Sequence, residues 1–179
     1  MNVNDIINKA LALLGVTDVT VAAGSADPRL AKLVNAVGVT YLQVITEYAP
    51  LEKEEAITVP SGGFNTAGLS EKLYDVVRLI DDSGEVVKCR LQGQTLVAKT
   101  GTYRLRYYYL PSSYPAIGGT ISLPPQVNET LFARGVAAEY ALESMMYEEA
   151  LLHDRKFKEG LMKALSQHAE KRLTVRRWI

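Results

Sequence analysis

The chain has 179 residues, of which 47% are hydrophobic and 22% are charged, and its 20 basic and 20 acidic side chains give a formal net charge of zero. This length supports one good core, or one core with a helical extension, and the composition is typical of a soluble globular protein. Because the net charge is zero, the charge of the whole chain does not favour binding to nucleic acid or to an anionic membrane.

Two further classes are excluded by what the sequence lacks. Its single cysteine, Cys89, leaves no internal disulfide and no thiolate metal cage. No apolar run approaches membrane-spanning length, and residues 1–7 lack the positive region of a secretion signal. We therefore expect a protein that is made inside the cell and makes no membrane contact.

Two helices are predicted in residues 1–50. Asn2 or Asn4 can cap the first helix, and Asp27 and Pro28 are a typical N-cap and first helical residue for the second. The apolar side of the first helix consists of Ile6, Ile7, Ala10, Leu11 and Leu14. The apolar side of the second consists of Leu30, Leu33, Val34, Val37, Tyr41, Val44 and Tyr48. We expect these two helices to pack on each other and on the sheet that follows.

From residue 55 to residue 122 the apolar period changes from 3.6 to two, which predicts strands. The expected strands are 56–59, 75–80, 86–91, 95–99 and 102–110. Asp81–Gly84 is a strong turn sequence, and Gln92–Gln94 is a second turn. The last two strands are expected to form a hairpin across Thr100–Gly101. The pattern predicts an antiparallel meander of four or five strands.

Two more helices are predicted in residues 123–179. Pro124 and Pro125 end the preceding strand and preset φ for a helix start. One face of the first helix is expected to contain Val127, Leu131, Gly135, Ala138, Leu142 and Met145. One side of the second is expected to contain Phe157, Leu161, Leu165 and His168. The fold class is therefore α+β, a single domain over 1–179 with helices of 1–50 and 123–179 around a small antiparallel meander in 55–122.

Charge is segregated between these last two helices. The acidic side chains of the helix expected over 126–149 are Glu129, Glu139, Glu143, Glu148 and Glu149, against the single cation Arg134. Residues 154–177 contain eight lysines and arginines against three acidic residues, a net charge of plus five. Segregation of this kind suits contacts between copies of the chain or with a partner.

No pattern typical of an enzyme is present, because the sequence has no P-loop, no dinucleotide glycine pattern and no His-Glu-x-x-His. His153 and His168 are too few for a metal site without carboxylates. Glu149 and His153 lie one helical turn apart, but a solvated helix face explains this spacing more simply. We expect no metal, no other cofactor and no enzymatic activity.

Two short stretches allow two interpretations each. In residues 103–109, Tyr103, Leu105, Tyr107 and Tyr109 alternate with Arg104, Arg106 and Tyr108. Aromatic and arginine side chains on a strand can stack nucleic-acid bases, but an aromatic face that covers helices is the commoner use. Residues 172–179 are either a frayed end or a docking segment. Trp178 and Ile179 favour docking, because Trp beside Arg is typical of an interface anchor.

The order of elements carries a resemblance to a known family. It comprises an N-terminal helix over 4–16, a long second helix, strands that include Leu73–Leu79 and Tyr103–Tyr107, and Leu123–Val127 leading into the Ala-rich helix Ala137–Leu142. This arrangement resembles the head-to-tail connector (adaptor) proteins of tailed bacteriophages, especially podophage-type tail accessory factors. The resemblance covers nearly the whole chain and is carried by pattern, not by invariant catalytic residues.

The resemblance implies a structural protein of the virion, placed at the head–tail junction and made in the host cytoplasm. Members of that family form a ring beneath the portal, commonly of twelve copies. The ring extends the DNA channel without sequence-specific binding and receives the next tail component. The implied partners are the portal protein, a downstream tail protein and further copies of the chain.

In that family the C-terminal helical region engages the portal, which corresponds here to residues 154–179. The residues expected to bind the partner are Arg155, Lys158, Lys171, Arg172, Arg176, Arg177, Trp178 and Ile179. The residues expected at the interface between subunits are Glu139, Glu143 and Glu148. An alternative function is a nucleic-acid-binding module that uses the Tyr/Arg strand and the basic C-terminal helix, and its binding should weaken steeply with salt.

Overall fold

The computed structural model describes residues 1–25 and 27–169, with side chains up to Ser166. The chain divides into two compact units. The helical unit combines residues 1–49 with residues 114 onward, and the strand unit is formed by residues 50–113. The predicted α+β class is confirmed. The strand-rich insertion, expected over 55–122, begins and ends earlier, and it forms a compact unit of its own.

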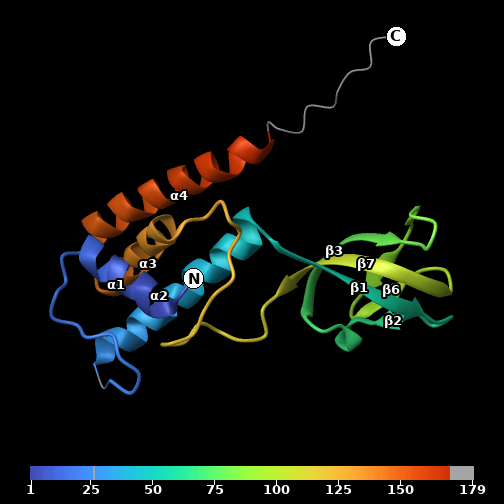
Figure 1. The fold of residues 1–179 in the computed structure, drawn as a ribbon, viewed down its shortest axis with the longest axis horizontal. Helices are drawn as coiled ribbons and strands as arrows, with labels where there is room; N and C mark the ends of the chain where they lie inside the picture. The colour runs from blue at the N-terminus through green and yellow to red at the C-terminus, as the bar shows by residue number, and fades with distance from the viewer. Residues whose placement is uncertain (26, 170–179) are drawn as a thin grey trace, which may run out of the picture. The chain divides into compact units, whose positions relative to one another are not determined.

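The helical unit is organised around one central helix. Its elements are α1 (Val3–Leu13), α2 (Pro28–Gln43), the π-helical turn η1 (Val44–Tyr48), α3 (Glu129–Glu143) and α4 (Tyr147–Ala169). Helix α3 packs against α1, α2 and α4, and α4 lies on its outer side (Figure 1). The position of α4 therefore depends mainly on its contacts with α3.

Side-chain caps fix where three of these helices begin. The Asn2 side chain accepts from the backbone N–H of Asn4 at 2.8 Å, and Asp27 accepts from that of Arg29 at 2.9 Å. Asn128 accepts from the N–H of Leu131 at 2.8 Å, so α3 begins at Glu129. The start predicted at residue 126 is wrong, because Asn128 and not the prolines provides the cap.

Burial of the first two helices agrees with their apolar periods. The residues predicted to be apolar contacts and found buried are Ile6, Ile7, Ala10, Leu11, Leu30, Leu33, Val37, Tyr41 and Val44. Both helices are covered by α3, whose buried residues include Phe132, Val136 and Tyr140. Within the helical unit, α1 and α2 thus pack against α3. The sheet that was predicted to cover these helices contributes to a separate core within the strand unit.

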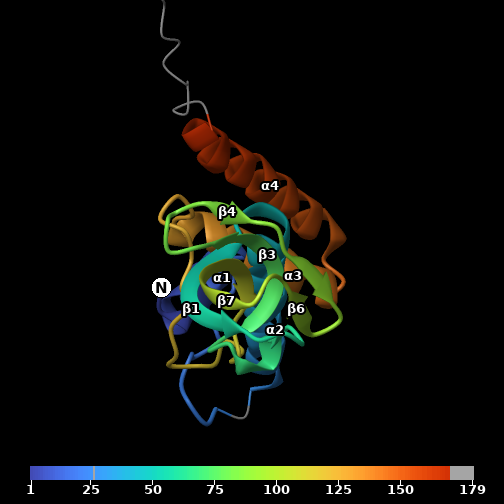
Figure 2. The same ribbon diagram turned by 90° about the vertical axis from the view of Figure 1, so that its right-hand side faces the viewer.

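The strand unit contains two antiparallel sheets. Its strands are β1 (Leu51–Val59), β2 (Phe64–Asn65), β3 (Lys72–Ile80), β4 (Val86–Val87), β5 (Arg90–Gln92), β6 (Thr95–Val97) and β7 (Gly101–Leu110), with a 3₁₀ turn η2 (Thr66–Gly68). One sheet has the order β1-β7-β3-β4 and the other the order β2-β6-β5. Figure 2 shows β1, β3 and β6 curving around a shared interior.

The strand order departs from the predicted meander. The turns at Asp81–Gly84 and at Gln92–Gln94 are confirmed, since they join β3 to β4 and β5 to β6. The hairpin predicted across Thr100–Gly101 is wrong, because β7 pairs with β1 and β3 while β6 pairs with β2 and β5. The long strand β7 therefore lies at the centre of its sheet and is joined to a first strand far away in sequence.

Candidate functional site

Large apolar side chains are exposed where α3 ends and α4 begins. Leu142, Met145, Tyr147 and Leu151 are between 52% and 77% exposed. On the apolar face predicted for this helix, Gly135 and Ala138 are buried, whereas Leu142 and, past the end of α3, Met145 are exposed. Contiguous apolar surface on a folded chain is typical of an interaction site.

The turn between the two helices explains this exposure. Met145 has a positive φ of 60°, the only non-glycine residue among those described that does. The N–H of Met146 donates to the carbonyl of Ala141 at 2.8 Å, which closes the end of α3. Helix α4 begins two residues after Met145, so the chain reverses before the 3.6-residue period of α3 can continue.

A groove of about 350 Å³ lies between α3 and α4 at this end. Its lining residues are Ala138, Glu139, Leu142, Tyr147, Ala150, Leu151, Asp154 and Lys158. Most of the wall is apolar, and three charged side chains lie along it. A volume of this size is at the lower end of the range for ligand pockets and can hold one large side chain with its neighbours.

The charges of the three ionisable residues in the groove, Glu139, Asp154 and Lys158, do not cancel. Lys158 donates to Asp154 at 2.9 Å within α4. Glu139 is half-buried, and its carboxylate has no hydrogen bond or ion pair with any described residue. Burial raises the pKa of Glu139, and the nearby Asp154 and Glu143 raise it further, while Lys158 acts in the opposite direction. A cation entering the groove beside Glu139 would meet an unpaired carboxylate in partly desolvated surroundings.

The residues predicted to bind a partner are only partly described. Arg155 and Lys158 lie on α4, where Arg155 pairs with Glu159 at 2.8 Å. Arg155 is exposed, whereas Lys158 contributes to the groove. The other predicted residues lie outside the described part of the chain: Lys171, Arg172, Arg176, Arg177, Trp178 and Ile179.

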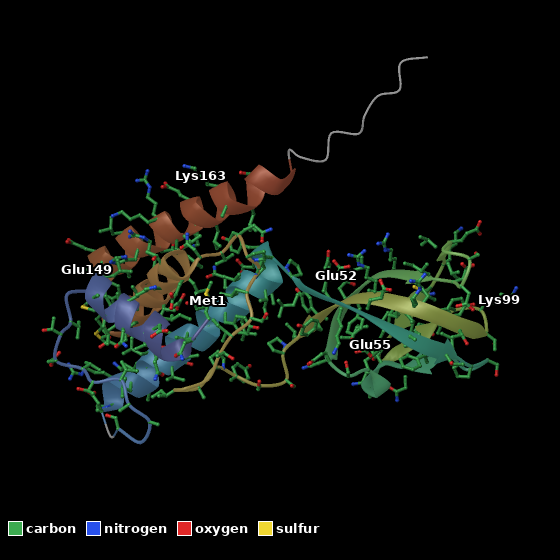
Figure 3. All side chains as sticks on the ribbon, viewed as in Figure 1. Met1, Glu52, Glu55, Lys99, Glu149 and Lys163 are labelled. Carbon is green, nitrogen blue, oxygen red and sulfur yellow. The ribbon has the colours of Figure 1, made fainter. Side chains whose placement is uncertain are left out.

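The three glutamates predicted at the subunit interface are not on one helix. Glu139 and Glu143 are on α3, and the Glu143 carboxylate accepts from the side chain of Asn35 at 2.5 Å. Glu148 is in the first turn of α4. The acidic helix predicted over 126–149 is therefore two helices, and Glu148 and Glu149 belong to the second. In Figure 3, Glu149 and Lys163 mark opposite charges along α4.

Small residues, not opposite charges, bring α3 and α4 together. A Cβ atom on Gly135 would lie 2.8 Å from the Phe157 ring, and one on Gly160 would lie 2.4 Å from Leu131. No ion pair joins α3 to α4 among the described residues. The acidic and basic charges on their outer surfaces are thus not used to hold the two helices together.

His153 faces the core, contrary to the solvated helix face predicted for it. It is 6% exposed, and its Nδ1 atom has no hydrogen-bond partner among the described residues. Burial lowers the pKa of His153, Arg134 and Lys156 lower it further, and Glu149 opposes them. The side chain is therefore held in its neutral form inside the helical unit.

A lowered folded-state pKa makes stability depend on pH in a defined direction. As pH falls through about 6.5, the unfolded chain takes up a proton at His153 before the folded chain does, so the free energy of unfolding should fall. One such proton gives a slope of at most about 1.4 kcal/mol per pH unit. Urea unfolding at pH 7.5 and 5.5 tests this.

The variant that tests this is His153→Leu, which should lose much of this slope. A slope equal to that of the unmodified chain would assign the pH dependence to other groups.

Much of the aromatic face of the Tyr/Arg strand lies in the core of the strand unit. Tyr103, Leu105 and Tyr107 on β7 are buried inside the strand unit. Their neighbours point outward, where Arg104 pairs with Glu54 at 3.7 Å and Arg106 pairs with Glu52, labelled in Figure 3. The aromatic face, predicted to cover helices, thus packs in the core of the strand unit, and Arg104 and Arg106 pair with glutamates of β1.

Tyr107 of β7 takes part in a polar cluster centred on Glu55 of β1. Tyr107 donates to Glu55 at 2.9 Å, and the backbone N–H and hydroxyl of Ser70 donate to the same carboxylate. Burial alone would raise the pKa of Glu55, but the hydrogen bonds from Ser70 and Tyr107 lower it overall. Lys53 lies 3.4 Å from the same carboxylate. We interpret the cluster as structural, because each of these groups already has a hydrogen-bond or ion-pair partner.

The described residues offer little else for chemistry. They contain no group of three His, Cys, Asp or Glu side chains that could hold a metal ion. Burial raises the pKa of the Cys89 thiol, which makes it a poor nucleophile. Within the same residues, no helix has the length and hydropathy needed to cross a membrane.

The sequence did not predict the groove, because two apolar stripes run along α4. Phe157 and Leu161 mark the stripe that is buried against α3. Tyr147 and Leu151, spaced by four residues, begin a second stripe that continues to Lys158 along the groove. That spacing was a signal for a second apolar face, but periodicity alone does not say which stripe is covered.

Comparison with known proteins gives no further assignment: no protein-family model matches the chain, and no curated protein matches its sequence.

Proposed function

We propose that the chain is the subunit of a head-to-tail connector in a tailed bacteriophage. Copies form a ring beneath the portal, the ring continues the DNA channel, and its far side receives the next tail component. The DNA passes through without sequence-specific binding, and no cofactor takes part. The family resemblance described above supports this proposal, and so does the surface chemistry of the helical unit.

The observation that carries the proposal is the apolar surface around the α3–α4 groove. Leu142, Met145, Tyr147 and Leu151 are exposed together at one end of a helix pair. An isolated chain gains nothing from keeping these side chains in water. Their exposure is accounted for if another protein surface covers them in an assembly.

The charges on α3 and α4 support the same conclusion. The side chains of Lys156 and Lys163 make no hydrogen bond or ion pair with a described residue, and neither does Glu139. Unpaired charges of both signs on one molecule favour contacts in which the acidic part of one copy meets the basic part of another molecule. A protein acting alone on a small substrate has no need of this arrangement.

The portal contact is assigned to the C-terminal end of the chain. Residues 171–179 contain four cations and end in Trp178 and Ile179. The cations should speed encounter with the portal, whereas the indole, which can bury about 150–250 Å², should provide most of the affinity. Arg155 on α4 is exposed and lies within the same region of the chain.

Deletion of Arg176–Ile179 should leave the fold intact and abolish portal binding or weaken it at least 100-fold. The melting temperature should be almost unchanged, because the described core of the helical unit is formed by side chains between Val3 and Leu161. Light scattering of the chain alone and mixed with its portal gives the masses of both complexes. Tight binding by the truncated chain would move the portal contact elsewhere, and absence of binding by the full chain would remove the proposed function.

A further inference from the structure

The α3–α4 groove has the chemistry to receive a peptide that contains a large apolar side chain next to a cation. Leu142, Tyr147 and Leu151 provide apolar walls. The half-buried Glu139 carboxylate lies in the same groove and has no partner among the described residues. An apolar side chain can displace water from the walls, while a cation beside it pairs with Glu139.

The C-terminal segment of the chain has this composition. Residues 171–179 contain Lys171, Arg172, Arg176 and Arg177 and no acidic residue, so they carry a net charge of plus four. Arg177 directly precedes Trp178, the only tryptophan of the chain. Cations and aromatic residues also occur together at 103–109 and at 155–158, but there Tyr103, Tyr107 and Phe157 are buried.

We propose that, before the portal is met, the groove holds residues 171–179 of a second copy of the chain. Trp178 enters between Leu142, Tyr147 and Leu151, and an adjacent arginine pairs with Glu139. The inference rests on the proposed function in one respect, because residues 171–179 would take part both in self-assembly and in docking to the portal. It names the contact between copies that the proposed function leaves unspecified.

The direction of α4 favours a second copy over the same chain. The groove ends near Asp154 and Lys158. Helix α4 continues from there to Ala169, about 22 Å beyond Asp154. To reach its own groove the chain would have to reverse there. Of the residues that favour such a turn, residues 161–179 contain no Gly, Pro, Asn or Asp, and their one serine, Ser166, lies within α4. Nine extended residues span about 30 Å, which is enough to reach a neighbouring molecule.

Such a contact joins two different surfaces, the tail of one copy and the groove of the next. Contacts of this type propagate in one direction and close into a ring when the rotation between copies permits it. A ring therefore needs no second type of contact to begin. Portal docking by the same tail would compete with the groove.

The test mixes two variants that are each defective in one half of the contact. The first carries Glu139→Lys and Leu151→Ser and keeps its tail, and the second lacks Arg176–Ile179 and keeps its groove. Analytical ultracentrifugation should show that each variant alone is a monomer and that the mixture contains a one-to-one dimer. Trp178 emission of the first variant should shift to shorter wavelength when the second is added, because only the first contains a tryptophan.

The matched control replaces the groove mutations with Leu152→Ser, which changes an exposed leucine on α4 that does not line the groove. This control should associate with itself like the unmodified chain, and the groove variant should lose at least tenfold in affinity. A mixture that stays monomeric would overturn the inference. A monomeric full chain with emission already at short wavelength would also overturn it, because the tail would then occupy its own groove.

Failure here is distinguishable from failure of the proposed function. The groove variant keeps its tail, so it should bind the portal at least as tightly as the unmodified chain. Portal binding without dimer formation by the mixed variants would preserve the connector function and remove the groove contact. Dimer formation without portal binding would do the reverse.

Discussion

Replacing Phe157 by Ala should lower the free energy of unfolding of the helical unit by about 3–5 kcal/mol, as truncation of a buried phenylalanine does. Phe157 is 1% exposed, and its ring lies where a side chain on Gly135 would be. Removal of the ring leaves a cavity between α3 and α4 that a glycine has no side chain to fill. Urea unfolding followed by circular dichroism measures the loss.

Met162→Ala is the matched control on the same helix. Met162 is 62% exposed, so its truncation should change stability by no more than about 0.5 kcal/mol. A loss below about 1 kcal/mol for Phe157→Ala would mean that α4 is held to α3 by other contacts. The Gly160–Leu131 approach would then be the first place to look.

The parts of the fold that depend on local residues could be predicted from the sequence. Asp27 and Pro28 define the start of α2, and the turn at Asp81–Gly84 joins two strands as expected. In each case the residues that decide the structure lie within a few positions of one another. Caps and tight turns are local in this sense, so a single sequence contains the information.

The parts that were wrong depend on which distant segment covers a given side chain. Met145 adopts the left-handed conformation, which a sequence usually indicates by a glycine. Because no glycine is present there, the break between α3 and α4 was predicted too late in the sequence. His153 is buried because α4 packs with that face inward, which no pattern in its own helix decides. Strand β7 pairs with β1, which lies some fifty residues earlier in the sequence. The two neighbouring strands around Thr100 resembled a hairpin, so the sequence did not indicate this distant pairing.

The groove includes Glu139 and Lys158, two residues singled out from the sequence, but its apolar character was not predicted. Residues near the end of the chain were expected to meet a partner, and the glutamates of α3 were expected near a second subunit. The groove combines Glu139 with Leu142, which was placed on an apolar helix face, and with Leu151, which was given no role. Surface charge is visible in a sequence, whereas exposure of an apolar side chain becomes visible only when the packing of the helices is known.

Replacing Tyr107 by Ala should destabilise the strand unit by about 3–5 kcal/mol, similar to the loss of a buried aromatic side chain, and leave the helical unit unaffected. Tyr107 is fully buried, and its hydroxyl donates to Glu55 at 2.9 Å. Burial raises the pKa of Tyr107 to about 12, with Glu55 contributing, so the phenol stays protonated and donates throughout the neutral range. The variant therefore loses both a core ring and a hydrogen bond.

Tyr107→Phe separates the two losses. It keeps the ring, and Glu55 still accepts from Ser70, so we expect a cost of only about 0.5–1.5 kcal/mol. Amide hydrogen exchange resolves the response of each unit. In Tyr107→Ala, protection should fall in β1 and β7, which are paired along their length, and stay unchanged in α3.

This separation is expected because the two cores share no residue. The core around Tyr107 is formed by Ile57, Val59, Leu69, Leu79, Leu96, Tyr103 and Leu105, all within residues 50–113. The helical unit buries Phe132, Val136 and Phe157 among its own helices. Equal loss of protection in α3 and β7 would show that the chain unfolds as one cooperative body despite its two cores. A loss confined to the strands would allow each unit to be altered separately when the proposed portal binding and self-association are tested.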